Sequence, residues 1–290
     1  MDLPKYAIVR GVPNTYDQCI RSVTVPIDVE LAKEQHRQYC ETLQELGLEL
    51  IYIEADDRYP DCCYVEDTAI VIGDVAVISR MGAPTRREEV IEVRKILDKC
   101  KKIHDIKPSG TIEGGDVLRI DDKLFIGLSK RTNISAVEQV RKIAAPLGVQ
   151  TIAVETKDLM HLKSDCTYLG RGHLLMAPGR FDEAPFNGYR KIIVPEEEAY
   201  AANCLAVGGN VIVSDGYPRT KRLIEEAGFA TISLDMSEFR KGEGALTCLS
   251  VMVLNTQEMV NLILWSKQNN VASGPERSGN LMPNDRININ

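Results

Sequence analysis

One structural plan recurs four times along this sequence, and this repeat limits the possible folds more than any other feature. Each copy begins with a polar or acidic residue, then has a short apolar run, a tight turn, a second apolar run and a helical segment. The copies begin with VEDTAIVI from Val65, TIEGGDVL from Thr111, HLKSDCTY from His161 and AANCLAV from Ala201. A fifth beginning, LTCLSVMV from Leu246, lacks a full module behind it. A period of roughly 20 to 50 residues is typical of architectures whose units pack against their neighbours.

The repeat places five side chains at matched positions, and successive members are 42 to 48 residues apart. They are Glu66, Glu113, His161, Asn203 and Cys248. If the modules form a ring around an axis, these side chains meet at one end of it. The incomplete module supports a ring, because a first strand at YAIVR from Tyr6 could pair with the strand after Cys248 and close the free sheet edge. We therefore predict an α/β fold of strand, strand, helix and strand modules, in a single domain over residues 1–290.

Composition narrows the class of protein. With 44% hydrophobic residues the chain can bury a sizeable core. A net charge of −7 and a pI near 5.3 argue against nucleic acid as a partner and are compatible with a small cationic substrate. The sequence has no apolar leader and no run of ~20 apolar residues, so we expect no membrane partner and a cytoplasmic location. Both a monomer and a homodimer remain open.

Cysteines and histidines give no sign of disulfides or bound metal. The eight cysteines include no C-x-x-C pair, so we expect free thiols in a reducing compartment. The four histidines lack metal-ligand spacing, and we expect neither a metal nor a cofactor. After Trp265 the sequence becomes polar and rich in Gly, Ser, Pro and Asn, which predicts a flexible tail over residues 268–290.

Local sequence signals predict where individual helices begin and end and where hairpin turns lie. Residues 28–46 keep helical apolar spacing, and Gly47 is suited to end that helix. A last helix is expected from Thr256. Two further helices are expected to begin at capping boxes, Thr85 with Glu88 and Ser135 with Glu138. Turn-forming residues, Gly73-Asp74 among them, separate the apolar runs and predict hairpins.

A cysteine, a histidine and carboxylates at matched positions supply the groups needed for covalent catalysis. Singly, Cys248 would more often be a small core residue and His161 a hydrogen-bonded core or surface residue, but their shared register favours a functional role. Glu113 precedes Gly114, where glycine at a strand start also permits close backbone approach. Asn203 is expected to be structural.

Two acids and two arginines extend this set. Glu66 and Asp67 are either solvated acids at a strand end or members of the site. Arg86 and Arg131 follow the second strand of successive modules, where an arginine at a helix N-terminus faces an unfavourable dipole. A guanidinium fork binds a carboxylate through two parallel hydrogen bonds. Acids at one end and arginines at the other suit a zwitterionic amino acid with a cationic tail.

Seven ordered segments carry a family resemblance. They are DCCYVED from Asp61, GAPTRREEV from Gly82, EGGDVL from Glu113, FIGLSKRTN from Phe125, HLKS from His161, PEEEAYAANC from Pro195 and LTCLSV from Leu246. From about Tyr6 to about Val253 the chain resembles the dimethylarginine dimethylaminohydrolase family. The resemblance implies a five-bladed α/β propeller around a central channel. It also implies hydrolysis of Nω-methylated L-arginines to L-citrulline and dimethylamine or methylamine.

The resemblance also implies roles for individual residues. Cys248 would attack the guanidinium carbon, His161 would protonate the departing amine and then deprotonate water, and Glu113 would hold both His161 and the guanidinium. Asp67 matches a guanidinium-binding acid. The remaining implied substrate contacts are Asp61 and Glu66 in the pocket, Arg86 and Arg131 at the α-carboxylate, Ile20 in a lid loop over 12–21, and the backbone of Gly242 at the substrate amine.

Three alternatives remain from this reading. Arginine deiminase shares the nucleophile and the histidine, but usually has an acid at the position of Lys163, and a lysine cannot bind a cation. An amidinotransferase would pass the amidino group to an amine instead of water. A binding protein with the same propeller would lack the catalytic groups that Cys248, His161 and Glu113 provide here, so we favour an enzyme.

Overall fold

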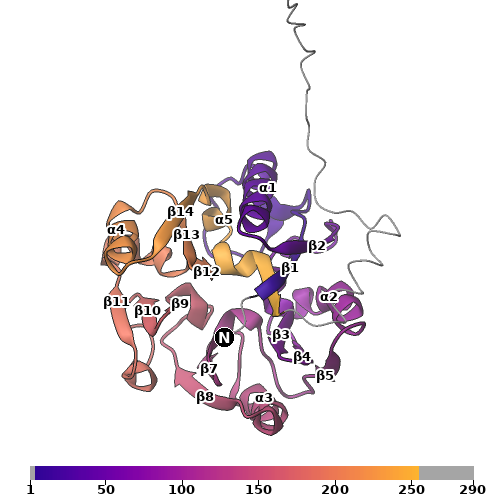
Figure 1. Cartoon of the computed structure of the whole chain (residues 1–290). Coiled ribbons are helices and arrows are strands. Elements are labelled where there is room, and N and C mark those ends of the chain that lie inside the picture. Colours follow the sequence, from indigo (N-terminus) through magenta and orange to yellow (C-terminus); the bar gives the residue numbers. More distant parts are fainter. Residues whose placement is uncertain (1–3, 255–290) are drawn as a thin grey trace, which may run out of the picture.

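Five small sheets make up the protein. A computed structural model describes residues 4–254. Within this range each sheet has three strands, the first antiparallel to the second and the second parallel to the third, and Figure 1 shows the sheets arranged around a common centre. Four sheets follow the chain in order: β3 (Ala69–Ile72), β4 (Val75–Ile78) and β5 (Lys102–Asp105); β6 (Val117–Ile120), β7 (Lys123–Leu128) and β8 (Gln150–Glu155); β9 (Cys166–Gly170), β10 (His173–Met176) and β11 (Arg190–Ile193); β12 (Leu205–Val207), β13 (Asn210–Ser214) and β14 (Ala230–Leu234).

The fifth sheet joins the two ends of the described chain. Strand β1 (Pro4–Arg10) lies between β15 (Ser250–Leu254), its antiparallel partner, and β2 (Glu49–Ile53), its parallel partner. Residues Ala7 and Val9 of β1 are fully buried. This pairing confirms that the first module is split between the beginning and the end of the repeat.

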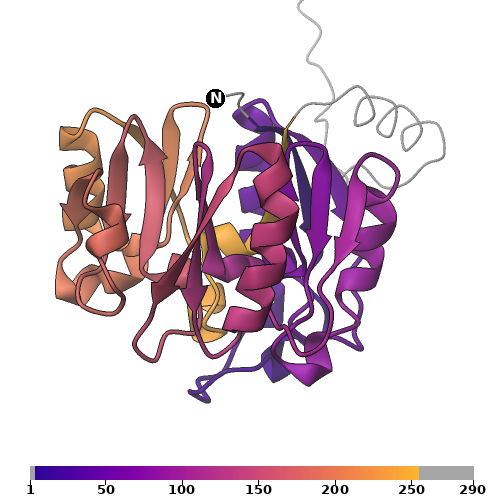
Figure 2. The same cartoon turned by 90° about the horizontal axis from the view of Figure 1, so that it is seen from below.

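Helices connect the second and third strands of four sheets. They are α1 (Val29–Glu45), α2 (Val90–Leu97), α3 (Ile134–Ala144) and α4 (Pro218–Glu226). They lie on the outside of the ring, and Figure 2 shows α3 against its own sheet. The sheet of β9, β10 and β11, which is the fourth when the ring is counted from the sheet of β15, β1 and β2, differs from the expected plan. Residues 177–189 between β10 and β11 hold only the 3-10 turn Ala184–Phe186. Two prolines and two glycines in this segment, APGRFDEAPFNGY, explain the missing helix.

Helix ends agree with the sequence signals only in part. Asp28 caps α1 by accepting a backbone N–H at 3.0 Å, and Gly47 follows the helix with a φ of 89°, as predicted. Helix α3 begins differently from the prediction, because Asn133 is its N-cap and Ser135 is already helical. Thr85 lies in a 3-10 turn that precedes α2. The expected helix from Thr256 and the expected tail over 268–290 lie outside the described residues.

Short 3-10 turns precede the first strand of each sheet in ring order. They are η2 (Val65–Thr68), η4 (Gly114–Asp116), η6 (Leu162–Ser164), η8 (Glu196–Ala202) and η9 (Leu246–Leu249). Neighbouring turns are joined by side chains that accept backbone N–H bonds: Asp67 accepts from Gly115 at 3.0 Å, Asp116 from Leu162 at 2.9 Å and Asn203 from Thr247 at 3.1 Å. The five matched residues of the repeat all stand on or directly beside these turns.

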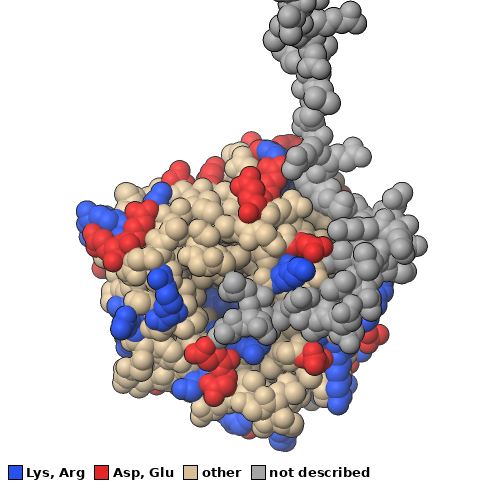
Figure 3. Space-filling view, viewed as in Figure 1, with Lys and Arg blue, Asp and Glu red and all other residues tan. Residues whose placement is uncertain are grey.

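Charged side chains of both signs lie on the face of the protein that Figure 3 shows. On the face shown in Figure 3, basic and acidic side chains are interspersed and neither sign forms a continuous patch. Among residues 4–254 no helix has the length and apolar character required to cross a bilayer.

Two glycines let the turn η4 approach its neighbours. A Cβ on Gly114 would overlap the backbone oxygen of Glu66, and one on Gly115 would lie 2.7 Å from Cγ of His161. The Gly-Gly pair after Glu113 is therefore required by close packing at the centre of the ring, as the sequence suggested.

We predict that Gly114→Ala destabilises the protein by roughly 1–3 kcal/mol, because the added methyl group meets backbone that cannot move aside easily. The matched control is Gly188→Ala, where a Cβ meets nothing within 4 Å, and its effect should stay within about 0.5 kcal/mol. Urea unfolding measures both. Equal stability of the two variants would contradict the proposed close packing at Gly114.

Candidate active site

An acid–imidazole cluster lies at the centre of the ring. Asp67, Glu113 and His161 come from three successive modules, and their nitrogen and oxygen ligand atoms lie within 4.8 Å of one another. Nε2 of His161 is 2.8 Å from Oε2 of Glu113 and 3.6 Å from Oδ1 of Asp67. All three residues are buried. The ring therefore brings together residues that the repeat had placed at or beside matched positions.

Charge in this cluster favours a protonated histidine. Burial alone would lower the pKa of His161, but the carboxylates of Asp67 and Glu113 outweigh it and raise that pKa to about 9. Burial opposes ionisation of the two acids as well, yet the imidazolium, and for Asp67 also Arg86, hold their pKa values below the ordinary range. At neutral pH, His161 is consequently a proton donor next to two ionised acids.

Cys248 lies on η9, in electrostatic reach of the same acids. Burial, followed by the charges of Glu66 and Asp67, raises the pKa of the Cys248 thiol to about 12. The side chain is partly exposed, unlike those of the other seven cysteines. In the free protein this group is a thiol, and a cation bound beside it would lower its pKa.

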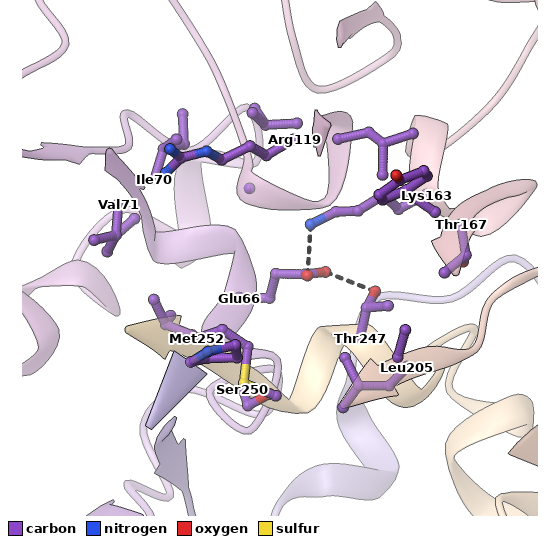
Figure 4. A pocket seen from close by; sticks show the side chains of 18 of the residues that line it. Glu66, Ile70, Val71, Arg119, Lys163, Thr167, Leu205, Thr247, Ser250 and Met252 are labelled. Carbon is purple, nitrogen blue, oxygen red and sulfur yellow. Dashed lines mark hydrogen bonds and ion pairs between the residues drawn. The ribbon is translucent and has the colours of Figure 1, made fainter. Parts of the chain in front are cut away.

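A hydrogen-bond network fixes the turn that carries Cys248, as Figure 4 shows in part. Oε2 of Glu66 accepts from the Thr247 hydroxyl at 2.9 Å, and Oε1 pairs with the Lys163 ammonium at 2.5 Å. The Asn203 amide exchanges two bonds with Thr247 and donates to the Lys163 carbonyl at 2.8 Å. Asn203 therefore has the expected structural role.

Sequence reasoning missed the role of Lys163. The lysine was noted only because it stands where a deiminase has an acid, whereas its ammonium neutralises Glu66. Both oxygens of Glu66 are thereby engaged, and the pKa of Glu66 is still raised because burial outweighs the charge of Lys163. The position of Lys163 two residues after His161, in the same turn, was the available signal.

A cavity of about 300 Å³ adjoins this network (Figure 4). Glu66, Lys163 and Thr247 line it together with apolar side chains, and further polar side chains of its wall are Arg119, Thr167, Tyr168 and Ser250. Neither Cys248 nor His161 lines it. The reactive groups and this cavity therefore share the Glu66 network as a common wall.

The two arginines lie among acids. Arg86 is 4% exposed, with Nη1 2.8 Å from Oδ2 of Asp67 and 3.9 Å from Oε2 of Glu113, and Nη2 2.9 Å from Oε2 of Glu89. Arg131 is less buried, and its Nη1 lies 3.7 Å from Oε1 of Glu113. In this structure the Arg86 guanidinium thus faces the acids expected to bind a substrate guanidinium, and it is not turned outward for a carboxylate.

Glu89 was absent from the sequence-based site. It is 1% exposed, and burial raises its pKa to about 7 although Arg86 opposes this. The spacing of three residues from Arg86 was a usable signal, since charges three or four residues apart meet across one helical turn.

The three-residue cluster has the donor types of a metal site, but its atoms are already engaged. Asp67 Oδ2 accepts from Arg86, and Glu113 Oε2 pairs with His161. A protonated imidazole has no lone pair to offer a metal. The cation held by these acids is a guanidinium group of the chain itself.

The predicted lid loop over 12–21 is tied to the body of the protein. The backbone N–H of Ile20 donates to Oδ1 of Asp61 at 3.1 Å, and the hydroxyls of Tyr16 and Tyr64 lie 2.6 Å apart. The Tyr64 hydroxyl also donates to the Gly242 carbonyl at 3.2 Å. These contacts join Ile20 to Asp61, and Tyr16 to Gly242 through Tyr64, and residue Ile20 is 40% exposed.

We predict that Glu113→Gln lowers the pKa of His161 from about 9 by at least ~1, because a hydrogen bond to a charged group is worth about 1.5–3 kcal/mol. Histidine NMR titration measures this. His36 is an internal reference, since burial holds its pKa near 4 in both proteins. A His161 titration that is unchanged in the variant would show that Glu113 does not stabilise the imidazolium.

We also predict that Lys163→Met destabilises the fold by about 3–5 kcal/mol, because it leaves Glu66 buried without its cation. Adding Glu66→Gln in the same chain should recover much of this loss, since the amide needs no counter-charge and its oxygen can still accept from Thr247. Chemical unfolding of the single and double variants tests the pair. A double variant no more stable than Lys163→Met would contradict it.

Sequence comparison finds dimethylarginine dimethylaminohydrolases among the relatives. A family model described as "N,N dimethylarginine dimethylhydrolase, eukaryotic" matches residues 12–176. The dimethylarginine dimethylaminohydrolase of Pseudomonas aeruginosa is 36% identical over 227 residues, which cover 77% of this chain and 89% of the relative. The protein of the same name from Streptomyces coelicolor is 35% identical over 233 residues, or 78% of this chain and 87% of the relative.

Solved structures agree with the sequence relatives. A mutant of the Pseudomonas aeruginosa enzyme complexed with citrulline matches with a TM-score of 0.83 at 32% identity, over 87% of this chain and 100% of the other. A dimethylarginine dimethylaminohydrolase adduct with S-methyl-L-thiocitrulline gives 0.84 at 32% identity, with the same coverage of 87% and 100%. The N-terminal domain of ArgZ, a cyanobacterial arginine dihydrolase, gives 0.79 at 22% identity over 86% of this chain and 98% of the other, which shows a shared fold alone.

Proposed function

The chain belongs to the dimethylarginine dimethylaminohydrolase family, and on that premise we propose that it hydrolyses Nω,Nω-dimethyl-L-arginine and Nω-monomethyl-L-arginine. The products are L-citrulline and dimethylamine or methylamine. The observation that carries the proposal is the buried cluster of Asp67, Glu113 and His161 beside the thiol of Cys248. Two ionised acids, a charged imidazole and a thiol form a site that can bind a guanidinium, attack its carbon and protonate the departing nitrogen.

The first half-reaction begins with binding of the guanidinium by Asp67 and Glu113. The bound cation lowers the pKa of Cys248, which releases its proton to solvent, and the resulting thiolate attacks the central carbon and forms a carbon–sulfur bond. Delocalised charge makes a guanidinium a poor electrophile, so a strong sulfur nucleophile is well suited to this step. His161 gives its proton to the alkylated nitrogen as the carbon–nitrogen bond breaks. The amine leaves, and an S-alkyl thiouronium remains on Cys248.

The second half-reaction consumes water. His161, now neutral, takes a proton from water, and the oxygen attacks the thiouronium carbon. Collapse of the adduct breaks the carbon–sulfur bond, and the hydroxyl proton passes to the departing thiolate. This step forms the ureido group of citrulline and restores the thiol of Cys248. Glu113 keeps the imidazole in orientation through both steps, at the 2.8 Å contact with Nε2.

The remaining substrate contacts complete the proposal. Arg131 binds the α-carboxylate and the Gly242 carbonyl accepts from the α-amino group. Ile20 covers the substrate from the lid, which Asp61 holds through the backbone N–H of Ile20. Exclusion of water by this lid strengthens every charge interaction inside. The eight cysteines, all within residues 4–254, form no disulfide there, which supports a cytoplasmic site of action.

Lys163 favours an alkylated substrate over free arginine. Its ammonium is committed to Glu66, so the position that could supply a further acid for an unsubstituted guanidinium supplies none. An arginine deiminase is the second candidate and would release ammonia. An amidinotransferase would transfer the amidino group to an amine.

We predict that purified protein forms citrulline from dimethylarginine and methylarginine at rates at least ~100-fold above that from arginine, with release of the matching amine. Parallel assays of citrulline and amine measure this for all three substrates. Cys248→Ser should abolish turnover, because a serine hydroxyl has no adjacent base to activate it, and should largely retain binding. Equal turnover of arginine would favour the deiminase, and turnover by Cys248→Ser would remove the nucleophile assignment.

A further inference from the structure

We propose that Arg86 is a specificity-determining residue whose Nη1 occupies the guanidinium subsite of the free enzyme, and that Nη1 gives up Asp67 only for a ligand that also carries a carboxylate. The inference rests on the proposed function, because it identifies the subsite from the acids Asp67 and Glu113. It explains why a cation stands where the substrate's cationic end should bind.

The contacts of Arg86 show that the subsite accepts a guanidinium. Nη1 lies 2.8 Å from Oδ2 of Asp67 and 3.9 Å from Oε2 of Glu113, while Nη2 is bonded to the backbone carbonyls of Asp61 and Tyr64 at 3.4 and 3.3 Å. The Tyr64 ring centroid lies 6.0 Å from the guanidinium carbon. Acids on one side, carbonyls on another and a ring nearby are the surroundings that a planar, delocalised cation requires.

Two edges of the Arg86 guanidinium have different partners. Nε and Nη2 form the fork that grips Glu89, with distances of 3.0 and 2.9 Å to Oε2. Nη1 points toward Asp67 and Glu113, which are the acids of the reaction. Glu89 can therefore retain the fork while Nη1 gives up Asp67. This asymmetry suits a residue that changes its partner, since one anchor remains throughout.

Substrate entry requires such an exchange. Asp67 Oδ2 is engaged by Nη1, and two guanidinium cations cannot share it at close range inside a buried site. A substrate that displaces Nη1 leaves Arg86 without one carboxylate. The α-carboxylate of an amino acid substrate restores that partner, whereas a free guanidine offers nothing in exchange. Arg86 therefore disfavours guanidinium compounds that lack a carboxylate.

A fixed counter-ion is the competing explanation for Arg86. In that case the residue neutralises the acids permanently and the substrate binds beside it. Removing it would then strengthen binding of any small cation by general electrostatics, and removing another nearby cation would do the same. Arg131 is the matched control, because its Nη1 lies 3.7 Å from Glu113.

The test uses the Cys248→Ser protein to prevent turnover, with Arg86→Met or Arg131→Met added. Calorimetry measures binding of methylguanidine, methylammonium and dimethylarginine. We expect Arg86→Met to bind methylguanidine at least ~10-fold more tightly than the parent, to gain less for methylammonium, and to lose at least ~10-fold for dimethylarginine. Arg131→Met should bind dimethylarginine more weakly than the parent, and it should not bind methylguanidine more tightly. Three results would overturn the inference. They are an equal gain in methylguanidine affinity in both variants, an equal gain for methylguanidine and methylammonium in Arg86→Met, and no gain in methylguanidine affinity in Arg86→Met.

A second measurement does not depend on folding of the Arg86 variant. In the Cys248→Ser protein, the guanidinium NMR signals of Arg86 should shift when dimethylarginine binds and stay in place with methylguanidine at the same concentration. Signals unaffected by dimethylarginine would show a fixed counter-ion. Failure of the proposed function is distinguishable, because it would appear as absence of methylarginine turnover by the unmodified enzyme, whatever Arg86 does.

Discussion

The site depends on a balance of buried charge. Three acids, Asp67, Glu89 and Glu113, and two cations, Arg86 and His161, lie within the core and are nearly without solvent contact. An isolated buried ion is costly, so each of these groups stays charged only because the others surround it. The proton on His161 is a consequence of this balance. Changing one member alters the state of all of them.

The same balance acts on Cys248, the proposed nucleophile. Burial and nearby acids hold Cys248 as a thiol with a pKa near 12, so the free enzyme offers little thiolate to unrelated electrophiles. Only a bound cation reverses this. The ring of turns makes the arrangement rigid, because Asp67 and Asn203 bond directly to the backbone of neighbouring modules. Asp67 therefore belongs both to the set of buried charges and to the hydrogen bonds that join neighbouring modules.

Much of this could be predicted from the repeat and the family resemblance. The pairing of the Tyr6 strand with the strand after Cys248, the five sheets and the helix over 28–46 follow from apolar periodicity and turn residues, which act locally. The missing helix in the fourth sheet could have been read from its prolines and glycines. Capping at Ser135 was wrong, because Asn133 stands two residues earlier and is an equally good cap.

The register of the repeat was determined by the sequence alone. That register places Glu113, His161 and Cys248 at one end of a ring, since a repeat of fixed length brings equivalent positions to the same axis. Only the tertiary structure decided which charges neutralise one another there. Arg86 lies against Asp67 and Glu89, and Lys163 lies against Glu66. The physical reason is that a long cationic side chain settles where the buried acids around it are least compensated, and that depends on every neighbouring module at once.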